Sequence, residues 1–350
     1  MTAASGRETT TKGARIAGVV SCVPSNNIDN SQFEDRFGGD SVADVVKMIG
    51  VLNRRQVAPG QTTGELCLKA GATLLVRLGW SPDSVDGLIF LTQTPDYRLP
   101  ATACALQHEL GLPPGILAFD INLGCSGYPY ALWLASTIIQ SGAAKRLLIA
   151  VGDTISRVVD PGARATARLF GDAGTVTAVE ADADAAPSTF ILGSDGAGAA
   201  NLIIPHGGFK DYAADADKRM EGKNPACLFM DGGEIFNFTL RSVPGLVGRL
   251  NALCEGDGEH DAYLMHQANK FMLNHLRKKS KLPEEKVPIN IQDFGNTSSA
   301  SIPLLMTTSI AADLRAKANK VAMFGFGVGY SWAAASMVIG PLAVAETIEL

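Results

Sequence analysis

Short apolar runs alternate with longer amphipathic segments along most of this chain. In the first half the runs that have the length and composition of buried strands cover residues 15–23, 85–92, 116–121, 145–153 and 171–180. Helical periodicity fills the intervals at 63–78, 102–110 and 130–139, with a further short helix expected at 40–49 and an exposed loop and strand at 50–58. Strands that alternate with helices predict an α/β protein with parallel sheets covered on both faces.

The second half repeats this order at a nearly constant offset. Its expected elements are strands at 261–266, 287–291, 320–325 and 329–338, and helices at 271–281 and 300–314. The repeat predicts two duplicated domains, residues 15–180 and 188–350, joined by an aperiodic Ala/Asp linker at 181–187. The polar first dozen residues are expected to be floppy.

Cys125 lies on a glycine-flanked turn between the strand at 116–121 and the apolar helix that follows. A sulfur at a helix N-terminus faces unpaired N–H groups and the positive end of the helix dipole, which favour a thiolate. We therefore interpret Cys125 as a candidate nucleophile. The alternative is a small buried apolar side chain, which is the usual role of a lone cysteine.

His266 and Asn296 fall on turns of the second half, and Asn296 occupies the position that corresponds to Cys125 in the repeat. The carboxyl ends of parallel strands are where α/β proteins place their sites, so these turns are expected to face one pocket. An imidazole and an amide are neutral hydrogen-bond donors that suit a developing enolate. Taken one at a time, His266 could also be a core histidine whose hydrogen bonds are satisfied, and Asn296 could be a helix cap.

Composition and charge exclude several classes of function. A formal net charge of -5 offers no basic face for nucleic acid. The six cysteines include no Cys-x-x-Cys pair, which argues against a zinc site and a disulfide framework and favours a reducing, cytoplasmic location. No signal peptide or membrane-spanning run is expected. The glycines at 325–329 lead into a strand, so the helix of a nucleotide-binding loop is missing.

Four motifs carry a resemblance to a known family: Asp120-Ile-Asn-Leu-Gly-Cys-Ser-Gly127, His266-Gln-Ala-Asn269, Gly295-Asn-Thr-Ser-Ser-Ala300 and Gly327-Val-Gly-Tyr-Ser-Trp332. In these contexts the chain resembles the thiolase superfamily, and within it the β-ketoacyl-acyl-carrier-protein synthase III group, from about residue 15 onward. The resemblance implies two βαβαβαββ halves in a five-layered α-β-α-β-α arrangement. True thiolases carry a second catalytic cysteine near the C-terminus, and residues 325–332 contain none.

The resemblance also implies a reaction. Cys125 would take an acyl group from a thioester, and His266 and Asn296 would stabilise the enolate formed when malonyl-acyl carrier protein loses CO2. The backbone N–H groups of Cys125 and Val328 would form the oxyanion hole. The substrates would be acyl-coenzyme A or acyl-carrier thioesters, with no further cofactor and no metal, and the expected assembly is a homodimer, with which the apolar stretches at 97–104 and 143–151 are compatible.

Two further groups of residues are assigned by the same resemblance. Arg164 and Phe236 are expected to bind substrate. A basic cluster, comprising Arg277, Lys278, Lys279 and Lys281, is expected to receive an acidic acyl carrier protein. The alternative for this cluster is a solvated surface without a partner.

The chain departs from the family pattern at five positions. Asp44 and Met48 stand near where coenzyme A-dependent members carry a Trp and an Arg, Phe271 replaces an Arg, and Gly233 replaces an Asn. Val328 replaces a glycine and stiffens the expected oxyanion turn. Losing an aromatic platform and two cations indicates a specialised enzyme, fed by a carrier protein or by an unusual acyl chain.

Two other functions remain open at this point. One is an acyltransferase that passes the Cys125-bound acyl group to an amine, hydroxyl or β-keto nucleophile without decarboxylation. The other is a scaffold subunit of a condensing pair, which is expected to have lost the nucleophile that this chain retains. The sequence does not define the starter acyl group, because the walls of the pocket would come from loops such as 95–100 and 207–225.

Overall fold

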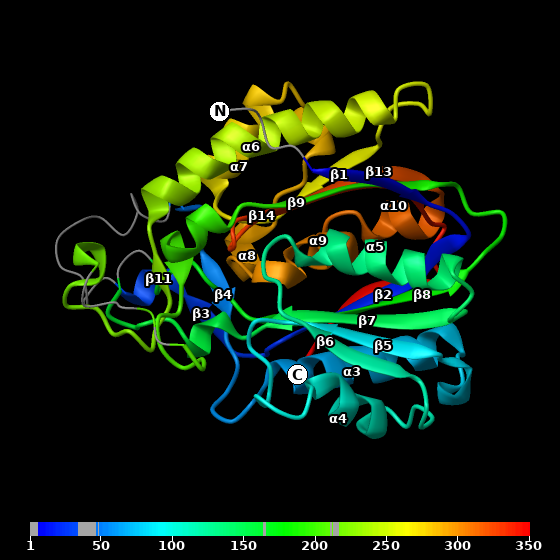
Figure 1. Cartoon of the computed structure of the whole chain (residues 1–350), viewed down its shortest axis with the longest axis horizontal. Coiled ribbons are helices and arrows are strands. Elements are labelled where there is room, and N and C mark those ends of the chain that lie inside the picture. The colour runs from blue at the N-terminus through cyan, green and yellow to red at the C-terminus, as the bar shows by residue number, and fades with distance from the viewer. Residues whose placement is uncertain (1–5, 34–46, 48, 164–165, 211, 213–216) are drawn as a thin grey trace.

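The computed structural model describes residues 6–33, 47, 49–163, 166–210, 212 and 217–350. Two mixed sheets and three layers of helices alternate through the molecule (Figure 1). This is the five-layered α-β-α-β-α arrangement expected from the sequence. Among the described residues, no helix has both the length and the apolar character needed to cross a membrane.

The lower sheet in Figure 1 has six strands, in the order β15 (Val344–Glu349), β2 (Ala14–Val23), β8 (Ala173–Ala181), β7 (Arg146–Asp153), β5 (Gly87–Leu91) and β6 (Leu117–Ile121). Its outer face is covered by α3 (Thr63–Leu78) and α4 (Thr102–Glu109). The boundaries of α3 follow from local signals, because Thr62 and Glu65 form a capping box and Gly79 ends the helix with a φ of 62°.

The upper sheet has five strands, in the order β1 (Arg7–Thr11), β9 (Ser188–Ser194), β14 (Ser331–Ile339), β13 (Asn319–Gly327) and β12 (Ala262–Met265). The helices α6 (Gly232–Leu253) and α7 (Lys270–Lys279) cover its outer face (Figure 1). Two strand pairs lie outside these sheets: β3 (Asn27–Asp29) with β4 (Asn53–Arg55), and β10 (Leu202–Ile203) with β11 (Phe229–Met230).

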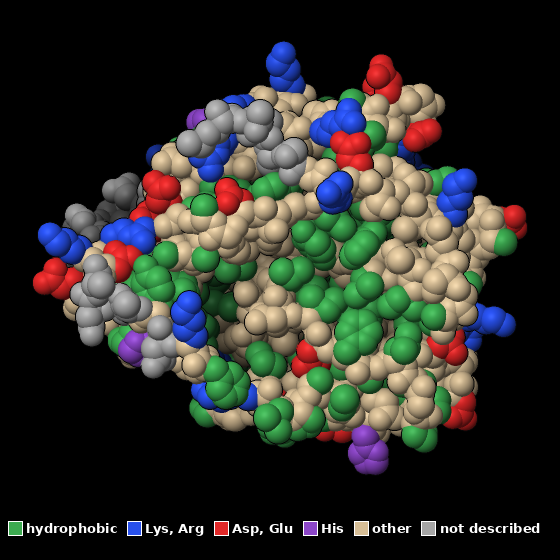
Figure 2. Space-filling model, in the orientation of Figure 1, with side chains coloured by type: hydrophobic (Ala, Val, Ile, Leu, Met, Phe, Trp, Pro, Cys, Tyr) green, Lys and Arg blue, Asp and Glu red, His purple; other side chains and the backbone are tan. Residues whose placement is uncertain are grey.

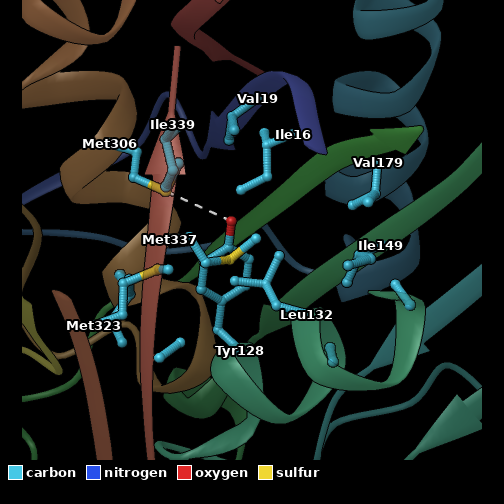
Figure 3. Close-up of a cluster of buried hydrophobic side chains, with 14 of the residues drawn as sticks. Ile16, Val19, Tyr128, Leu132, Ile149, Val179, Met306, Met323, Met337 and Ile339 are labelled. Atoms are coloured by element: carbon cyan, nitrogen blue, oxygen red, sulfur yellow. Dashed lines mark hydrogen bonds between the residues drawn. The ribbon is translucent and has the colours of Figure 1, made fainter. Parts of the chain in front are cut away.

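The central layer contains α5 (Gly127–Gln140), α9 (Ser301–Thr308) and α10 (Ala311–Ala316), with the short α8 (Ile291–Phe294) before them. Both sheets bury apolar side chains against this layer. Figure 3 shows Tyr128 and Leu132 of α5 among side chains from both sheets, with the Tyr128 hydroxyl directed at the Met306 sulfur 3.5 Å away. Because α5 is buried on most sides, its first turn is held in a fixed position between the halves.

The duplication of the chain is visible in the order of the paired strands within the two sheets. The run β2-β8-β7-β5 in one sheet corresponds to β9-β14-β13-β12 in the other. The connection between β8 and β9 lies where the linker was expected. The end strands are exchanged, since β1 joins the upper sheet and β15 the lower one. The domain boundaries 15–180 and 188–350 therefore stay a prediction.

Several local expectations are wrong. The sheets are mixed and not parallel, because β8 and β14 each follow the preceding strand without an α-helix between them and pair with it antiparallel. The floppy first dozen residues include β1, a Thr-rich edge strand paired with β9. No strand forms at 287–291, where Pro288 lacks a donor and the Asn290 N–H donates to the side chain of Gln267.

The remaining differences concern helices and burial. The helix expected at 300–314 is split around Ser309, where the hydroxyls of Thr307 and Thr308 bond to the Leu304 carbonyl and compete with the helical pattern. The loop at 50–58 is not fully exposed, because Arg54 is 1% exposed. The helix expected at 40–49 lies largely outside the described residues.

Candidate active site

Cys125 lies between β6 and α5, on a tight turn that the Gly127 N–H closes by donating to the Gly124 carbonyl at 2.7 Å. The side chain is buried, with 8% exposed. The end of β13 packs directly on this turn: a Cβ atom on Gly325 would lie 2.7 Å from the Cα of Ser126, and one on Gly327 would lie 3.0 Å from the Cys125 Sγ. Glycine is required at 325 because the two halves of the chain touch there backbone to backbone, and a side chain at 327 would press on the Cys125 side chain.

His266 follows β12 directly and is buried. Its backbone N–H donates to the Phe324 carbonyl at 2.8 Å, and its Nδ1 lies 2.8 Å from the Ser301 Oγ. Burial lowers the pKa of the imidazole to about 4, so the ring is neutral near pH 7. Ser301 engages Nδ1, and the backbone of Ser298 also hydrogen-bonds with the ring, so the imidazole is held by two residues of the second half.

Asn296 lies between α8 and a 3-10 turn at Ser298–Ala300. Its backbone is clamped from both sides, since its N–H donates to the Leu169 carbonyl and its carbonyl accepts from the Gly171 N–H. The Oδ1 atom accepts the Ser298 N–H at 2.9 Å, which fixes the orientation of the amide. The Nδ2 group has only a long contact of 3.5 Å with the Ala268 carbonyl and so remains available as a donor.

Ser298 is the residue that these three side chains share. Its backbone N–H holds Asn296, hydrogen bonding with its side chain opposes the rise in the pKa of Cys125, and hydrogen bonding with its backbone raises the pKa of His266. Ser298 itself has a φ of 52°, an uncommon backbone conformation for a residue with a side chain. The sulfur, the imidazole and the carboxamide therefore surround one constrained turn.

The expectation that Cys125 is a thiolate is wrong for the unliganded protein. Burial raises the pKa of the Cys125 thiol to about 11, and the negative charge of Asp153 adds to that rise. Hydrogen bonds from Ser298 and from the backbone of Val328 and Cys125 act in the opposite direction but do not overcome burial. The helix begins at Gly127, two residues beyond the cysteine, which limits what its N-terminus contributes.

The backbone N–H groups of Cys125 and Val328 are both directed at the sulfur, since each acts on the pKa of that thiol as a hydrogen-bond donor. Val328 lies between β13 and β14 and is flanked by Gly327 and Gly329. These are the two donors that were expected from the sequence to form an oxyanion hole, and that assignment stays a prediction.

Of the two residues predicted to bind substrate, only Phe236 lies among the described residues. Arg164, Asp44 and Met48 lie outside the described residues. Phe236 lies on α6 and stacks on Phe271, with ring centroids 5.7 Å apart.

The predicted docking cluster lies at the C-terminal end of α7. Arg277 forms an ion pair with Glu284 at 2.8 Å, and its side chain is only 15% exposed. Lys278, Lys279 and Lys281 are exposed, although the Lys279 Nζ donates to the Leu240 carbonyl at 2.8 Å. The accessible positive charge is therefore carried by the lysines and not by Arg277.

Three residues of the site were not identified from the sequence: Ser298, Ser301 and Asp153. A run of serines after Asn296 has the composition of a helix cap, and Asp153 ends a strand that was assigned to the core. The common feature that could have indicated them is position, because Asp153 ends an apolar strand, and Ser298 and Ser301 lie at the beginning of a central helix.

Two cavities accompany these elements. One of about 170 Å³ is lined by Arg54, Ser156 and Phe170 among others, and Phe170 forms a backbone bridge with Asn296. A larger one of about 700 Å³ lies at the C-terminal ends of α6 and α7 and includes none of the catalytic candidates. Within the described residues no cluster of His, Cys, Asp and Glu has the composition of a metal site.

Comparisons with known proteins identify the family and the fold. Residues 119–196 match the family described as 3-Oxoacyl-[acyl-carrier-protein (ACP)] synthase III, and residues 256–339 match its C-terminal domain. The beta-ketoacyl-[acyl-carrier-protein] synthase III 2 of Streptomyces coelicolor is 33% identical over 93% of this chain and 94% of its own length. The corresponding enzyme of Gloeobacter violaceus is 34% identical over 91% of this chain and 96% of its own length.

Solved structures extend the likeness. A 3-oxoacyl-(acyl-carrier protein) synthase from Burkholderia xenovorans is 60% identical and superposes with a TM-score of 0.97 over 99% of both chains. The priming β-ketosynthase of the R1128 polyketide pathway is 25% identical, with a TM-score of 0.78 over 94% of this chain and 97% of its own. The chain therefore has the thiolase fold and belongs to the 3-oxoacyl-[acyl-carrier-protein] synthase III family, as an acyltransferase of the condensing type.

Proposed function

We propose that Cys125 accepts an acyl group from a thioester and that the acyl-enzyme is then condensed, with loss of CO2, with a malonyl thioester carried by acyl carrier protein. The observation that carries this proposal is the arrangement around Ser298, which holds a buried thiol, a neutral imidazole and an oriented amide against one turn. A covalent intermediate lets the two thioesters enter in succession.

The acylation step follows from the state of the thiol. The Cys125 pKa is about 11 and the His266 pKa about 4, so proton transfer from one to the other is strongly unfavourable before substrate binds. The Cys125 sulfur attacks the thioester carbonyl as its proton passes to the departing sulfur of the donor, which leaves as a thiol. The N–H groups of Cys125 and Val328 hold the carbonyl oxygen during this exchange, each contributing roughly 3–4 kcal/mol.

The condensation step uses the two neutral donors. The malonyl thioester loses CO2, and the electron pair of the broken C–C bond forms an enolate whose oxygen accepts from the His266 Nε2–H and the Asn296 Nδ2–H. The enolate carbon then attacks the carbonyl on Cys125, the bond to Sγ breaks, and the β-ketoacyl product leaves. The sulfur departs as a thiolate and takes up one proton from solvent, which restores the thiol. A charged imidazolium is not required, which agrees with the lowered pKa of His266.

A comparison of three variants tests this division of roles. Cys125→Ala is expected to abolish the covalent acyl adduct that intact-mass measurement detects after incubation with acyl thioesters. His266→Ala and Asn296→Ala are expected to retain the adduct and to lose release of CO2 from malonyl-carrier protein. An adduct that persists in Cys125→Ala contradicts the nucleophile, and an acyl-enzyme that forms product without CO2 release supports the non-decarboxylating acyltransferase instead.

Carrier-protein docking is the second part of the proposal. Lys278, Lys279 and Lys281 are exposed at one end of α7, and the turn that holds His266 lies at the other end. A helix of this length spans about 15 Å, a distance that the flexible arm of a carrier protein must cover. The acidic carrier is attracted by this charge, which acts mainly on association.

Charge reversal tests the docking surface. The double variant Lys278→Glu/Lys279→Glu is expected to raise the KM for the malonyl carrier severalfold while kcat changes little, and to weaken the salt dependence of KM. Lys69→Glu, on the exposed face of α3 in the opposite outer layer, is the matched control. Equal effects of the two changes on KM would exclude docking at α7.

A homodimer completes the proposal, and β6 and α5 support it. Strand β6 ends the order of its sheet and pairs only with β5 among the described strands, which leaves one backbone edge free. The adjoining face of α5 carries Trp133, Leu134 and Ile138, all partly exposed, and Figure 2 shows apolar side chains gathered over this region. The region 143–151 does not contribute, because most of its apolar side chains are in the core.

Sedimentation measurements test the assembly. Trp133→Glu is expected to convert the dimer to monomer at micromolar concentration, because a charge would be buried in the contact. Val76→Glu, at an exposed apolar position on α3, is the control. Identical sedimentation of both variants as dimers would contradict an interface at α5.

A further inference from the structure

Asp153 ends β7 and is fully buried, yet its side chain forms no ion pair with any described residue. Its carboxylate is satisfied by neutral donors alone. Oδ1 accepts the Gln93 N–H at 2.7 Å and the hydroxyls of Thr92 and Thr94 at 3.1 and 3.3 Å, and Oδ2 accepts the Ser299 hydroxyl at 2.9 Å. A buried carboxylate without a cation is costly: burial raises the pKa of Asp153, and the hydrogen bonds from Gln93, Ser298, Ser299 and Thr92 act against that rise and favour the charged form.

The two oxygens of Asp153 face different halves of the chain. The donors to Oδ1 follow β5 in the lower sheet, which carries the Cys125 turn. The donor to Oδ2 is Ser299, three residues after Asn296, and the side chain of Ser298 is also among the hydrogen-bond donors to this carboxylate. Asp153 is therefore a bridge between the sheet that positions the nucleophile and the turn that positions the enolate donor.

Asp153 also acts on the nucleophile. Among the groups that act on Cys125, Asp153 supplies the negative charge, and Ser298, Val328 and the cysteine's own N–H are hydrogen-bond donors. The Ser298 side chain hydrogen-bonds with Asp153 and with the Cys125 sulfur. A hydroxyl has one proton to donate, so the carboxylate competes with the sulfur for it.

We propose that Asp153 is a positioning residue of the condensation reaction, which ties the Asn296 turn to the Cys125 sheet and whose negative charge adds to the effect of burial in keeping the free enzyme's cysteine a thiol. The first role rests on the proposed function, whereas the second concerns the unliganded protein and does not. In the acyl-enzyme the sulfur no longer competes for a proton, and the Ser298 hydroxyl is left to Asp153. The turn that holds Asn296 is then fixed when the malonyl thioester enters.

The test uses Asp153→Asn, which keeps the shape and an oxygen acceptor but removes the charge. Iodoacetamide labelling of Cys125, followed by peptide mapping across pH, measures the thiol without any substrate. Removing a negative charge favours the thiolate, so the midpoint is expected to fall by at least one pH unit and labelling near neutral pH to rise about tenfold. Asp120→Asn, which removes a carboxylate that caps α4, is the control and is expected to leave the midpoint unchanged.

Ser299→Ala separates the bridge from the charge. It removes the bond to Oδ2 while the carboxylate remains, so we expect CO2 release from malonyl-carrier protein to fall about tenfold in kcat, with acylation of Cys125 and the labelling midpoint unchanged. A folded Asp153→Asn protein with the wild-type midpoint overturns the electrostatic role. If Asp153→Asn does not fold, wild-type condensation by Ser299→Ala overturns the bridge. Failure of the proposed function itself appears separately, as absence of CO2 release from the wild-type protein.

Discussion

The neutral state of His266 can be tested through the pH dependence of folding. Burial lowers its pKa from 6.5 to about 4, whereas in the unfolded chain the pKa returns to its ordinary value. Between these two values the unfolded state binds more protons, so stability falls as pH falls through 6.5 and the loss is complete below about 4. At about 1.36 kcal/mol for each pH unit, His266 alone accounts for roughly 3 kcal/mol of unfolding free energy over this range.

His266→Asn removes the titrating group and keeps a polar atom near the position of Nδ1, within reach of Ser301. We expect the wild-type protein to lose roughly 3 kcal/mol more than this variant between pH 7 and pH 4, measured by urea unfolding. His260, whose pKa is also lowered to about 4 by burial, is present in both proteins and cancels in the comparison.

Histidine-selective carbon-13 NMR measures the same quantity directly. The chain has five histidines, so the resonance of His266 can be assigned by its loss in the variant. A titration midpoint of His266 near pH 6.5, or equal pH dependence of unfolding for the two proteins, would refute the argument that burial keeps the imidazole neutral. It would also remove the reason for treating His266 as a neutral donor to the enolate.

Two further substitutions test the packing around the site. Gly327→Ala is expected to slow acylation of Cys125 by at least tenfold, because the new methyl group would lie 3.0 Å from Sγ. Time courses of intact mass measure the acylation rate. Gly232→Ala is the control, because a Cβ atom there would have no neighbour within 4 Å. Tyr128→Phe leaves the buried Thr177 hydroxyl without its partner at 3.1 Å. We expect the free energy of unfolding, measured with urea, to fall by about 1–3 kcal/mol. A fall of less than a few tenths of a kcal/mol would show that this hydrogen bond contributes nothing to stability.

The sequence was sufficient for the features that rest on periodicity. Helix α3 occupies the expected residues, since a capping box and a terminal glycine mark its ends locally. The alternation of strands and helices and the turns that hold Cys125, His266 and Asn296 follow from the repeat, whereas the five layers were expected from the family resemblance. Such features are local or repeat at a fixed offset, so a single chain displays them.

Features that depend on long-range contacts were missed. The strand β1 is polar and Thr-rich, and only its pairing with β9 makes it a strand. Arg54 has the sequence context of an exposed loop, but its guanidinium is buried and donates to Asn30 and to the Phe170 carbonyl. In each case the partner lies more than 20 residues away and cannot be identified from the neighbouring residues.

The state of Cys125 shows why chemistry is harder to predict than placement. The turn and the following helix were evident, and by themselves they favour a thiolate. Burial and Asp153 reverse that preference, and both arise from elements distant in the chain: β13 covers the sulfur, and β7 supplies the carboxylate. A thiol that loses its proton only as it attacks a bound thioester is protected from unwanted oxidation and alkylation, because the thiolate is the reactive form. The cost of burying the nucleophile is thereby linked to selectivity for its substrate.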